Sequence, residues 1–454
     1  MSDSGTRATE ALLHALEARE RGELKPAIRH LQEAAALSAP EHYCHHLLSG
    51  WLIEDGRTDE ARAILETIVR EAPAVAPMLD LAALVTRDGD LTRARGLYSA
   101  VLALEPANAV ASTMIGRVDA AIEDTARRLD RTMGDLVLEH RYPTPYVEFA
   151  GRPHGAHTDG LWVNGQPLDA WGFPNHAPPV LPKPANELRL FVLGDSTLFG
   201  GSDLDQTVPA LLERELHGRG FDRARVYNFS IVSACSRQML VLLLLDLVDH
   251  APDLVVVCNG ALDLLLPRVY DPRPGYPLAF FMTETLVKHF FDPSCADQPL
   301  TRAAFLNRAA ADQLKLRYQT GWLTDAWEEA LVGDYLRSVE KLARLAAAYG
   351  IAVALLLEPM VATRAEPTAE ERDYLKPETF DYYRRQYGRI RRALFGADAA
   401  PHARASRMTV HDASAAFDAE AETVFKDYMH FNPTGCRLMA NYMAGVVTGR
   451  LGAR

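Results

Sequence analysis

The sequence predicts two parts of different fold class: an all-α helical repeat domain, followed by an α/β domain whose parallel sheet is covered by helices on both faces. Three observations lead to this prediction. A glycine and an alanine five residues apart recur at intervals of 34 and then 33 residues within the first hundred positions. From residue 188 onward, short apolar runs alternate with longer segments of helical periodicity. A chain of 454 residues is also longer than the chains that usually fold around a single hydrophobic core.

The first of these patterns defines a repeating pair of helices. The repeated positions are the glycines Gly22, Gly56 and Gly89 and the alanines Ala27, Ala61 and Ala94. Glycine tolerates the left-handed conformation that ends a helix, so each glycine is expected to end the first helix of a pair. The small alanine lets the second helix pack closely against the first. This pattern resembles the tetratricopeptide repeat, with three units over about residues 8–107 and a capping helix to about residue 133.

The resemblance implies a concave groove that binds a protein or peptide partner, so residues 1–133 are predicted to recruit one. A second interpretation stays open, in which the helices only stabilise the rest of the chain or form an oligomer. Residues 134–187 are rich in proline, glycine, histidine and aromatic residues and show no helical period. They are predicted to form an irregular connector that packs on the last domain, residues 188–454.

In that last domain, strands and helices are predicted in alternation. The predicted strands are residues 188–193, 225–228, 254–258, 351–357 and 407–411. The predicted helices are residues 208–219, 236–250, 324–349, 377–395 and 428–451. The long segment 266–301 is expected to form an insertion beside the domain's ligand site, as functional long loops often do. Four of its polar and aromatic side chains are expected either to contact a ligand or to pack on the surface: Arg268, Tyr270, Arg273 and Tyr276.

Ser196 occupies a position suited to a nucleophile. The apolar run 188–193 breaks at Gly194 into Asp195-Ser196-Thr197, where a helix is expected to begin. Ligands bind at the carboxyl ends of strands in open α/β sheets. A serine hydroxyl reacts only when a base takes its proton and a third group orients the base. Near the C-terminus, Asp427 and His430 lie three residues apart and offer that base and its orienting carboxylate on one turn.

These two stretches resemble the first and last blocks of the SGNH, or GDSL-like, hydrolase family. The resemblance covers about residues 142–454 and implies a three-layer α/β/α, flavodoxin-like domain with Ser196, Asp427 and His430 as its catalytic residues. Residues 168–174, Leu-Asp-Ala-Trp-Gly-Phe-Pro, resemble the lead-in segment of bacterial members linked to surface-glycan modification. In the alternative interpretation, Ser196 only caps a helix and the other two residues form a surface pair.

The resemblance also implies an oxyanion hole, and here the sequence departs from the family. The family supplies the backbone N–H of the serine, the N–H of a glycine in a second block, and an asparagine side chain in a third. Ser233 stands where the glycine is expected, and Leu262 stands where the asparagine is expected. Asn259 or Asn228 is the candidate substitute for the missing amide. The predicted oxyanion-hole residues are therefore Ser196, Ser233, Asn259 and Gly260.

Composition narrows the range of partners and locations. The formal net charge is −12, which disfavours a nucleic-acid partner. The most apolar run, residues 239–248, is far shorter than the roughly 20 residues that span a bilayer, so no membrane span is expected. The polar opening of the chain and five scattered cysteines predict a cytoplasmic protein with reduced thiols. No Walker-type loop or His/Cys cluster occurs in the sequence, so neither a cofactor nor a metal is predicted.

Together these patterns predict a serine esterase or acyltransferase that forms an acyl-enzyme on Ser196. Its expected substrate is a short acyl ester, such as an acetyl group, on a small molecule, a glycan or a glycosylated carrier. The alternative is a non-catalytic adaptor of the SGNH fold with a degraded oxyanion hole, which Leu262 favours. A lipid or thioester hydrolase is a third hypothesis, but the sequence gives no clear apolar pocket for one.

Overall fold

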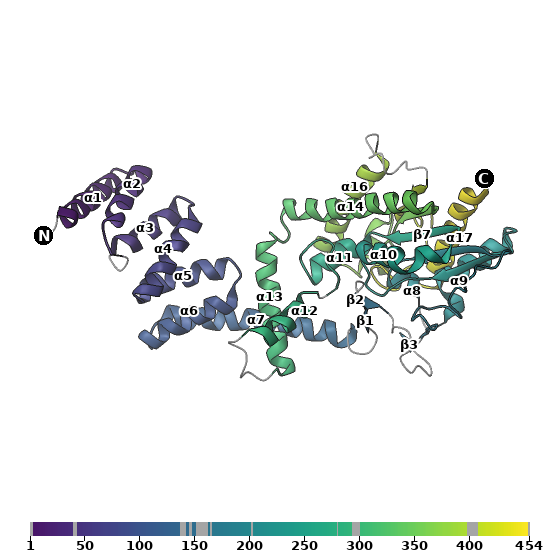
Figure 1. The fold of residues 1–454 in the computed structure, drawn as a ribbon, viewed down its shortest axis with the longest axis horizontal. Helices are drawn as coiled ribbons and strands as arrows, with labels where there is room; N and C mark the ends of the chain where they lie inside the picture. Colours follow the sequence, from purple (N-terminus) through teal and green to yellow (C-terminus); the bar gives the residue numbers. More distant parts are fainter. Residues whose placement is uncertain are drawn as a thin grey trace. The chain divides into compact units, whose positions relative to one another are not determined.

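The computed structural model describes residues 3–39, 43–136, 142–144, 148–150, 162–163, 166–200, 203–278, 280–292, 300–396 and 407–452 (Figure 1). The chain forms two compact units. Unit 1 contains Met1–Asp130 and Thr285–Gln319, and unit 2 contains Arg131–Glu284 and Thr320–Arg454. None of the helices within the described ranges is both long enough and apolar enough to cross a membrane.

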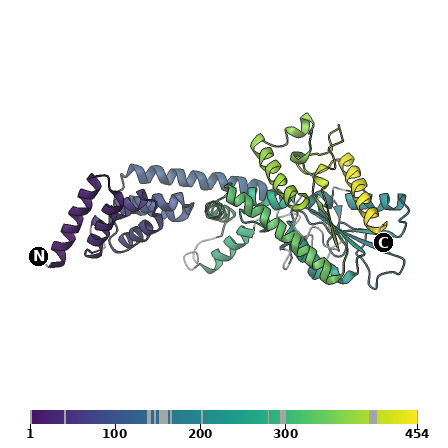
Figure 2. The same cartoon turned by 90° about the horizontal axis from the view of Figure 1, so that it is seen from above.

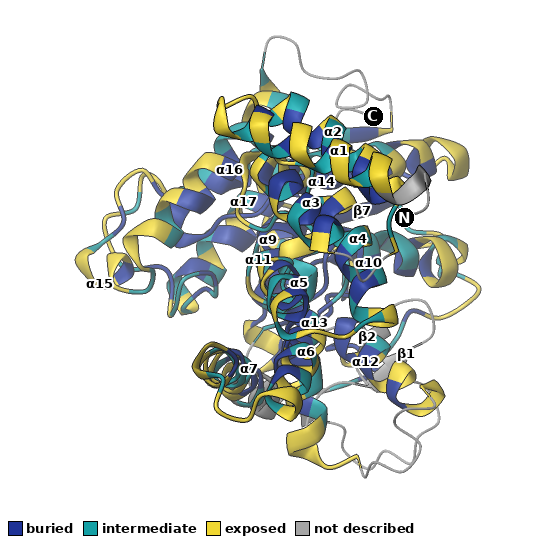
Figure 3. Ribbon diagram, turned by 90° about the vertical axis from the view of Figure 1, so that its left-hand side faces the viewer, coloured by how far each residue is buried: buried dark blue, intermediate teal, exposed yellow. Residues whose placement is uncertain are grey.

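Unit 1 is all-α and begins with successive helix pairs. Its N-terminal helices are α1 (Asp3–Glu20), α2 (Leu24–Ala36), α3 (Tyr43–Glu54), α4 (Thr58–Glu71), α5 (Val75–Arg87), α6 (Leu91–Leu104) and α7 (Ala109–Leu136) as far as Asp130. The predicted glycines end α1, α3 and α5, and their φ angles are 78°, 81° and 75° for Gly22, Gly56 and Gly89. The three repeated alanines are fully buried, and Figure 3 shows the buried residues on the sides by which the helices face one another. The predicted helix pairs and their turns are confirmed.

Unit 1 also contains a segment from much later in the chain. This segment is the end of α12 (Phe280–Phe291) and the whole of α13 (Arg302–Gln319). On α13, Lys315 Nζ lies 2.6 Å from Asp90 Oδ2. A Cβ atom added to Gly89 would lie 2.9 Å from Tyr318 Cβ, so α13 approaches the α5–α6 turn very closely. The predicted domain 188–454 includes Thr285–Gln319. In the structure, however, these residues pack with the helix pairs of unit 1.

Unit 2 is built on a parallel sheet that has five strands in the described part of the chain. They are β5 (Leu188–Leu193), β6 (Ala224–Asn228), β7 (Leu254–Asn259), β8 (Val353–Leu357) and β9 (Met408–His411). The strand order is β6-β5-β7-β8-β9, and all neighbours are parallel. The sequence predicts each of these strands to within two residues, because a sheet buried on both faces leaves nearly continuous apolar runs.

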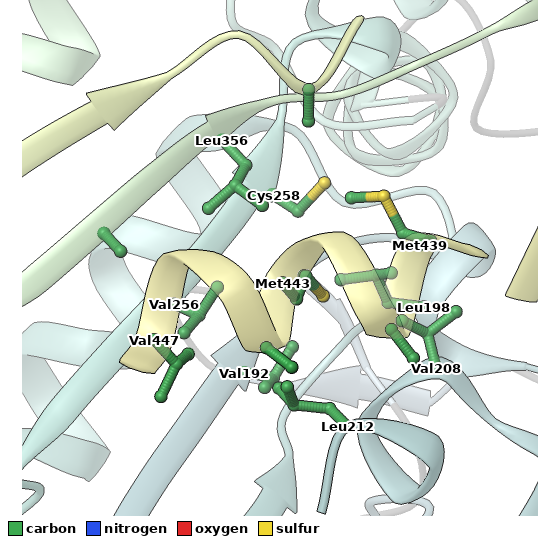
Figure 4. Close-up of a cluster of buried hydrophobic side chains, with 14 of the residues drawn as sticks. Val192, Leu198, Val208, Leu212, Val256, Cys258, Leu356, Met439, Met443 and Val447 are labelled. Atoms are coloured by element: carbon green, nitrogen blue, oxygen red, sulfur yellow. The ribbon is translucent and has the colours of Figure 1, made fainter. Parts of the chain in front are cut away.

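Helices cover both faces of this sheet, which gives the predicted three-layer α/β/α fold (Figure 2). On one face, α9 (Val208–Gly218) and α17 (Pro433–Gly452) pack together, and Figure 4 shows Met443 of α17 in one cluster with Val192 and Leu212. On the other face lie α10 (Ser236–Leu242) and α14 (Asp325–Tyr349). The remaining helices of unit 2 include α8 (Ser196–Phe199), α11 (Ala261–Val269), α15 (Ala369–Arg372) and α16 (Pro377–Phe395).

The connector contributes short strands and one well-packed segment. The strand pairs are β1 (Tyr142–Thr144) with β2 (Glu148–Ala150) and β3 (Trp162–Val163) with β4 (Gln166–Pro167). In the lead-in segment, Trp171 and Phe173 both contact the ring of Phe229, just after β6. Asp169 accepts hydrogen bonds from the backbone N–H groups of both aromatic residues. This segment therefore packs beside the end of β6.

Candidate active site

Ser196 lies at the carboxyl edge of the sheet, where β5 ends and α8 begins. The carboxylate of Asp195 caps this helix, because its Oδ1 accepts a hydrogen bond from Thr197 N–H at 2.8 Å. Ser196 itself is only half-buried, whereas both of its neighbours are buried. The capped turn thus fixes the backbone and leaves the serine side chain accessible.

Asp427 and His430 form one tight turn before α17. Asp427 Oδ1 accepts hydrogen bonds from Met429 N–H at 2.9 Å and from His430 N–H at 2.8 Å. The other oxygen, Oδ2, lies 2.7 Å from His430 Nδ1. A backbone hydrogen bond from Lys426 N–H to the His430 carbonyl, at 2.8 Å, closes the turn. The predicted last helix therefore starts at Pro433 and not at residue 428, since these hydrogen bonds replace the first helical turn.

The structure brings Ser196 and this turn together. His430 Nε2 lies 2.8 Å from Ser196 Oγ, and His430 Nδ1 faces Asp427. With a proton on Nδ1, the imidazole donates to the Asp427 carboxylate and accepts the serine O–H through Nε2. This is the arrangement in which an imidazole can remove a hydroxyl proton while a carboxylate holds its tautomer.

The electrostatics of Asp427 suit an orienting carboxylate. Burial alone would raise its pKa, but the hydrogen bonds and charge of His430, with the N–H of Met429, lower its pKa below the ordinary value. Asp427 is therefore ionised at neutral pH and can stabilise a protonated imidazole.

A buried ion pair holds the chain segment that leads into this turn. Arg364 and Glu371 are almost fully buried and contact each other. Glu371 Oε1 accepts hydrogen bonds from the backbone N–H groups of Val424 and Phe425, at 2.9 and 3.3 Å. Sequence reasoning missed this pair, although Thr368-Ala-Glu-Glu371 carries the Ser/Thr-x-x-Glu signature of a capping box, which the structure shows at α15.

Ser233 and Gly260 adopt backbone conformations that are unusual for most residues. Ser233 has a φ of 60°, so it takes the left-handed conformation of the glycine expected at its position. Gly260 precedes α11 with a φ of 120°, and a Cβ there would lie 2.9 Å from Leu357 Cδ1. The N–H groups of Ser196, Ser233 and Gly260 remain the predicted oxyanion-hole donors.

The two candidate substitute asparagines have structural partners. Asn228 Nδ2 donates to the carbonyl of Leu198 at 3.0 Å and so ties β6 to α8. Asn259 Oδ1 accepts a hydrogen bond from the hydroxyl of Tyr335 at 3.1 Å. Leu262 is 3% exposed and belongs to the buried side of α11. The role of Asn259 in the oxyanion hole stays a prediction.

The two arginines of the segment 266–301 make intramolecular contacts. Arg268 lies over the ring of Tyr382, and Arg273 donates to Asp271 and Glu284 while lying over Tyr276. Of the two interpretations of these side chains, ligand contact or packing, the structure therefore favours packing for Arg268, Arg273 and Tyr276.

Neither a protein-family model nor a curated protein sequence matches this chain. Among solved structures, a similar one is the acetyl xylan esterase AlAXEase, with 14% identity over 57% of this chain and 99% of the esterase and a TM-score of 0.34. A GDSL-like lipase from Bacteroides thetaiotaomicron has 14% identity over 60% of this chain and 93% of the lipase, with a TM-score of 0.32. TesA has 19% identity over 56% of this chain and 96% of its own length, with a TM-score of 0.29.

Proposed function

We propose that the protein is a serine esterase or acyltransferase that forms an acyl-enzyme on Ser196. The observation that supports this proposal best is the unbroken hydrogen-bonded chain from Ser196 Oγ through His430 to Asp427, with contacts of 2.8 and 2.7 Å. Nucleophile, base and orienting acid within hydrogen-bond reach are the geometric signature of nucleophilic acyl transfer.

The chemistry follows from these contacts. His430 Nε2 takes the proton of Ser196 Oγ as the oxygen attacks the carbonyl carbon of an ester, while Asp427 stabilises the imidazolium. The N–H groups at Ser196, Ser233 and Gly260 are the proposed donors to the oxyanion. The intermediate then expels the alcohol, which takes the proton from His430 and leaves an acyl group on Ser196. Water or an acceptor hydroxyl, deprotonated by His430, releases that acyl group.

The proposed substrate is a short acyl ester, such as acetyl, on a glycan or a glycosylated carrier. The lead-in segment supports this proposal through its resemblance to glycan-modifying proteins. The test is the rate of hydrolysis of p-nitrophenyl acetate, butyrate and decanoate, followed by acetate release from acetylated oligosaccharides. A preference for acetyl is expected, and a preference for decanoate would contradict the short-acyl proposal.

The helix pairs of unit 1 are proposed to recruit a protein or peptide partner. A photocrosslinking residue in place of the exposed Arg87 on α5 tests this, with the exposed Lys25 on α2 as the matched control position. One defined crosslinked product from position 87 and none from position 25 is the expected result. Equal crosslinking at both positions would contradict a partner-specific surface.

A second candidate function is a non-catalytic adaptor, which Leu262 favours because it takes the place of an amide donor. A folded wild-type protein without ester turnover and without reactivity at Ser196 would be the result that supports it.

A further inference from the structure

Two buried carboxyl groups hydrogen bond to Thr197, the residue that follows Ser196. Asp195 is 1% exposed and Glu358, which follows β8, is 0% exposed. Thr197 bridges them, because its N–H donates to Asp195 Oδ1 at 2.8 Å and its hydroxyl donates to Glu358 Oε1 at 2.6 Å. The proposed acyl-transfer reaction uses neither carboxyl as an acid or a base.

The hydrogen bonding of the pair is incomplete if both groups are ionised. Asp195 Oδ2 and Glu358 Oε2 are both buried, and neither finds an N–H or O–H donor among the residues that the structure describes. Both carboxyl groups are held by the same residue, Thr197, and each affects the pKa of the other. A proton shared between the two groups would give the orphan oxygens a partner, whereas two ionised carboxylates would leave them unpaired and repelling.

The surroundings favour a proton on Glu358. Burial and the charge of Asp195 raise the pKa of Glu358 well above its ordinary value. Burial also raises the pKa of Asp195, but the Thr197 hydrogen bonds and the nearby His430 oppose that rise. The other titratable groups that face the pair are Cys258 of β7, Tyr335 of α14, Tyr387 of α16 and Tyr428 of the Asp427 turn. Cysteine and tyrosine are ordinarily neutral at pH 7, so none of these four groups adds a charge beside the pair.

We propose that Glu358 is a positioning residue that keeps its proton at neutral pH, donates it in a hydrogen bond to the Asp195 carboxylate, and so fixes the first turn of α8 beneath Ser196. The backbone N–H of Glu358 donates a hydrogen bond to the carbonyl of Asn259 at 2.9 Å, next to Gly260. Glu358 thereby links the nucleophile turn to the loop that carries another predicted oxyanion-hole donor. The single negative charge left on Asp195 attracts the imidazolium of His430.

The protonation state is tested without reference to activity. Infrared difference spectra of the full chain at pH 7, wild type minus Glu358→Gln, are expected to show the carbonyl band of a protonated carboxyl in the wild type only. Glu366→Gln is the matched control, because the Glu366 side chain is 85% exposed, and it is expected to leave that band unchanged. Loss of only a carboxylate signal in Glu358→Gln would overturn the proposal.

The position of the proton is tested kinetically, and this arm rests on the proposed function. Glutamine imitates a protonated glutamate, so Glu358→Gln is expected to keep kcat for p-nitrophenyl acetate within about threefold, whereas Glu358→Ala loses about tenfold to a hundredfold through misplacement of the nucleophile. Asp195→Asn imitates a protonated aspartate and is expected to lose more kcat than Glu358→Gln. The reverse order would place the proton on Asp195 and overturn the assignment. A wild-type protein without ester turnover would contradict the proposed function. The infrared result would still decide the protonation state of Glu358.

Discussion

His430 Nε2 lies 2.8 Å from Ser196 Oγ, although the two residues are 234 positions apart in the sequence. The sheet produces this contact, because β5 delivers Ser196 to its carboxyl edge and the turn before α17 returns to the same edge. Asp427 then completes the arrangement from within the turn that contains His430. Three residues from two distant segments thus form one hydrogen-bonded path.

Replacing members of this path should abolish ester hydrolysis without unfolding the protein. His430→Ala and Asp427→Asn are expected to lower kcat by about 10⁴-fold, the magnitude typical of a lost base or a wrong imidazole tautomer. The measurement is steady-state hydrolysis of p-nitrophenyl acetate. His176→Ala is the matched control, since this histidine pairs with Asp205 at an exposed surface and should keep wild-type activity. Equal loss in the control variant would contradict a specific role for His430.

Acid should weaken the wild-type protein through Asp427. Its pKa is lower in the folded than in the unfolded chain, so its contribution to stability is present above the unfolded pKa of about 4 and is lost as the pH falls through the folded pKa. Asp427→Asn removes this titration. Denaturant unfolding at pH 7 and below pH 4 should therefore show a difference between the two proteins that shrinks in acid. A difference independent of pH would mean that Asp427 is not stabilised in its ionised form.

Ser233 should tolerate glycine but not a β-branched residue. Its φ of 60° costs an L-residue about 1–2 kcal/mol, and branching at Cβ makes this conformation worse. Ser233→Gly is expected to keep kcat, whereas Ser233→Val should lower the free energy of unfolding by about 1–2 kcal/mol and reduce kcat. Thermal unfolding and ester hydrolysis check both. A normal kcat in Ser233→Val would exclude this backbone N–H as an oxyanion donor.

The buried ion pair of Arg364 and Glu371 should be needed to hold the catalytic turn. Removing one partner of a buried pair leaves an uncompensated charge and typically costs about 3–5 kcal/mol. Arg364→Met and Glu371→Gln are expected to lower the free energy of unfolding by about that amount. They should also reduce kcat, because Glu371 binds the backbone N–H groups of Val424 and Phe425. Exposed Arg372→Met, on the same short helix, is the control. Unchanged stability in both core variants would contradict this prediction.

The sequence predicts the sheet and the position of Ser196 well, because both depend on local signals. Continuous apolar runs mark strands that are buried on both faces, and the break after residue 193 marks the edge where Ser196 lies. The glycines that end α1, α3 and α5 are equally local, since a positive φ restricts the residue type.

Long-range packing is what the sequence does not reveal. The contact between Thr197 and Glu358 joins residues 161 positions apart, and a single glutamate after a strand has no distinguishing pattern. The grouping of α13 with the helix pairs depends on contacts such as Lys315 with Asp90, which span 225 positions. The sequence places the start of α17 too early, because the Asp427 side chain accepts hydrogen bonds from N–H groups that a helix would otherwise use.

Covalent labelling by a fluorophosphonate probe shows directly whether Ser196 is an activated nucleophile. The full-length wild type and Ser196→Ala are treated in parallel, and intact mass and peptide mapping locate the adduct. We expect one adduct on Ser196 in the wild type, none in Ser196→Ala, and strongly slowed labelling in His430→Ala. A folded wild type that stays unlabelled, or an adduct that persists in Ser196→Ala, would contradict the assignment of Ser196 as an activated nucleophile.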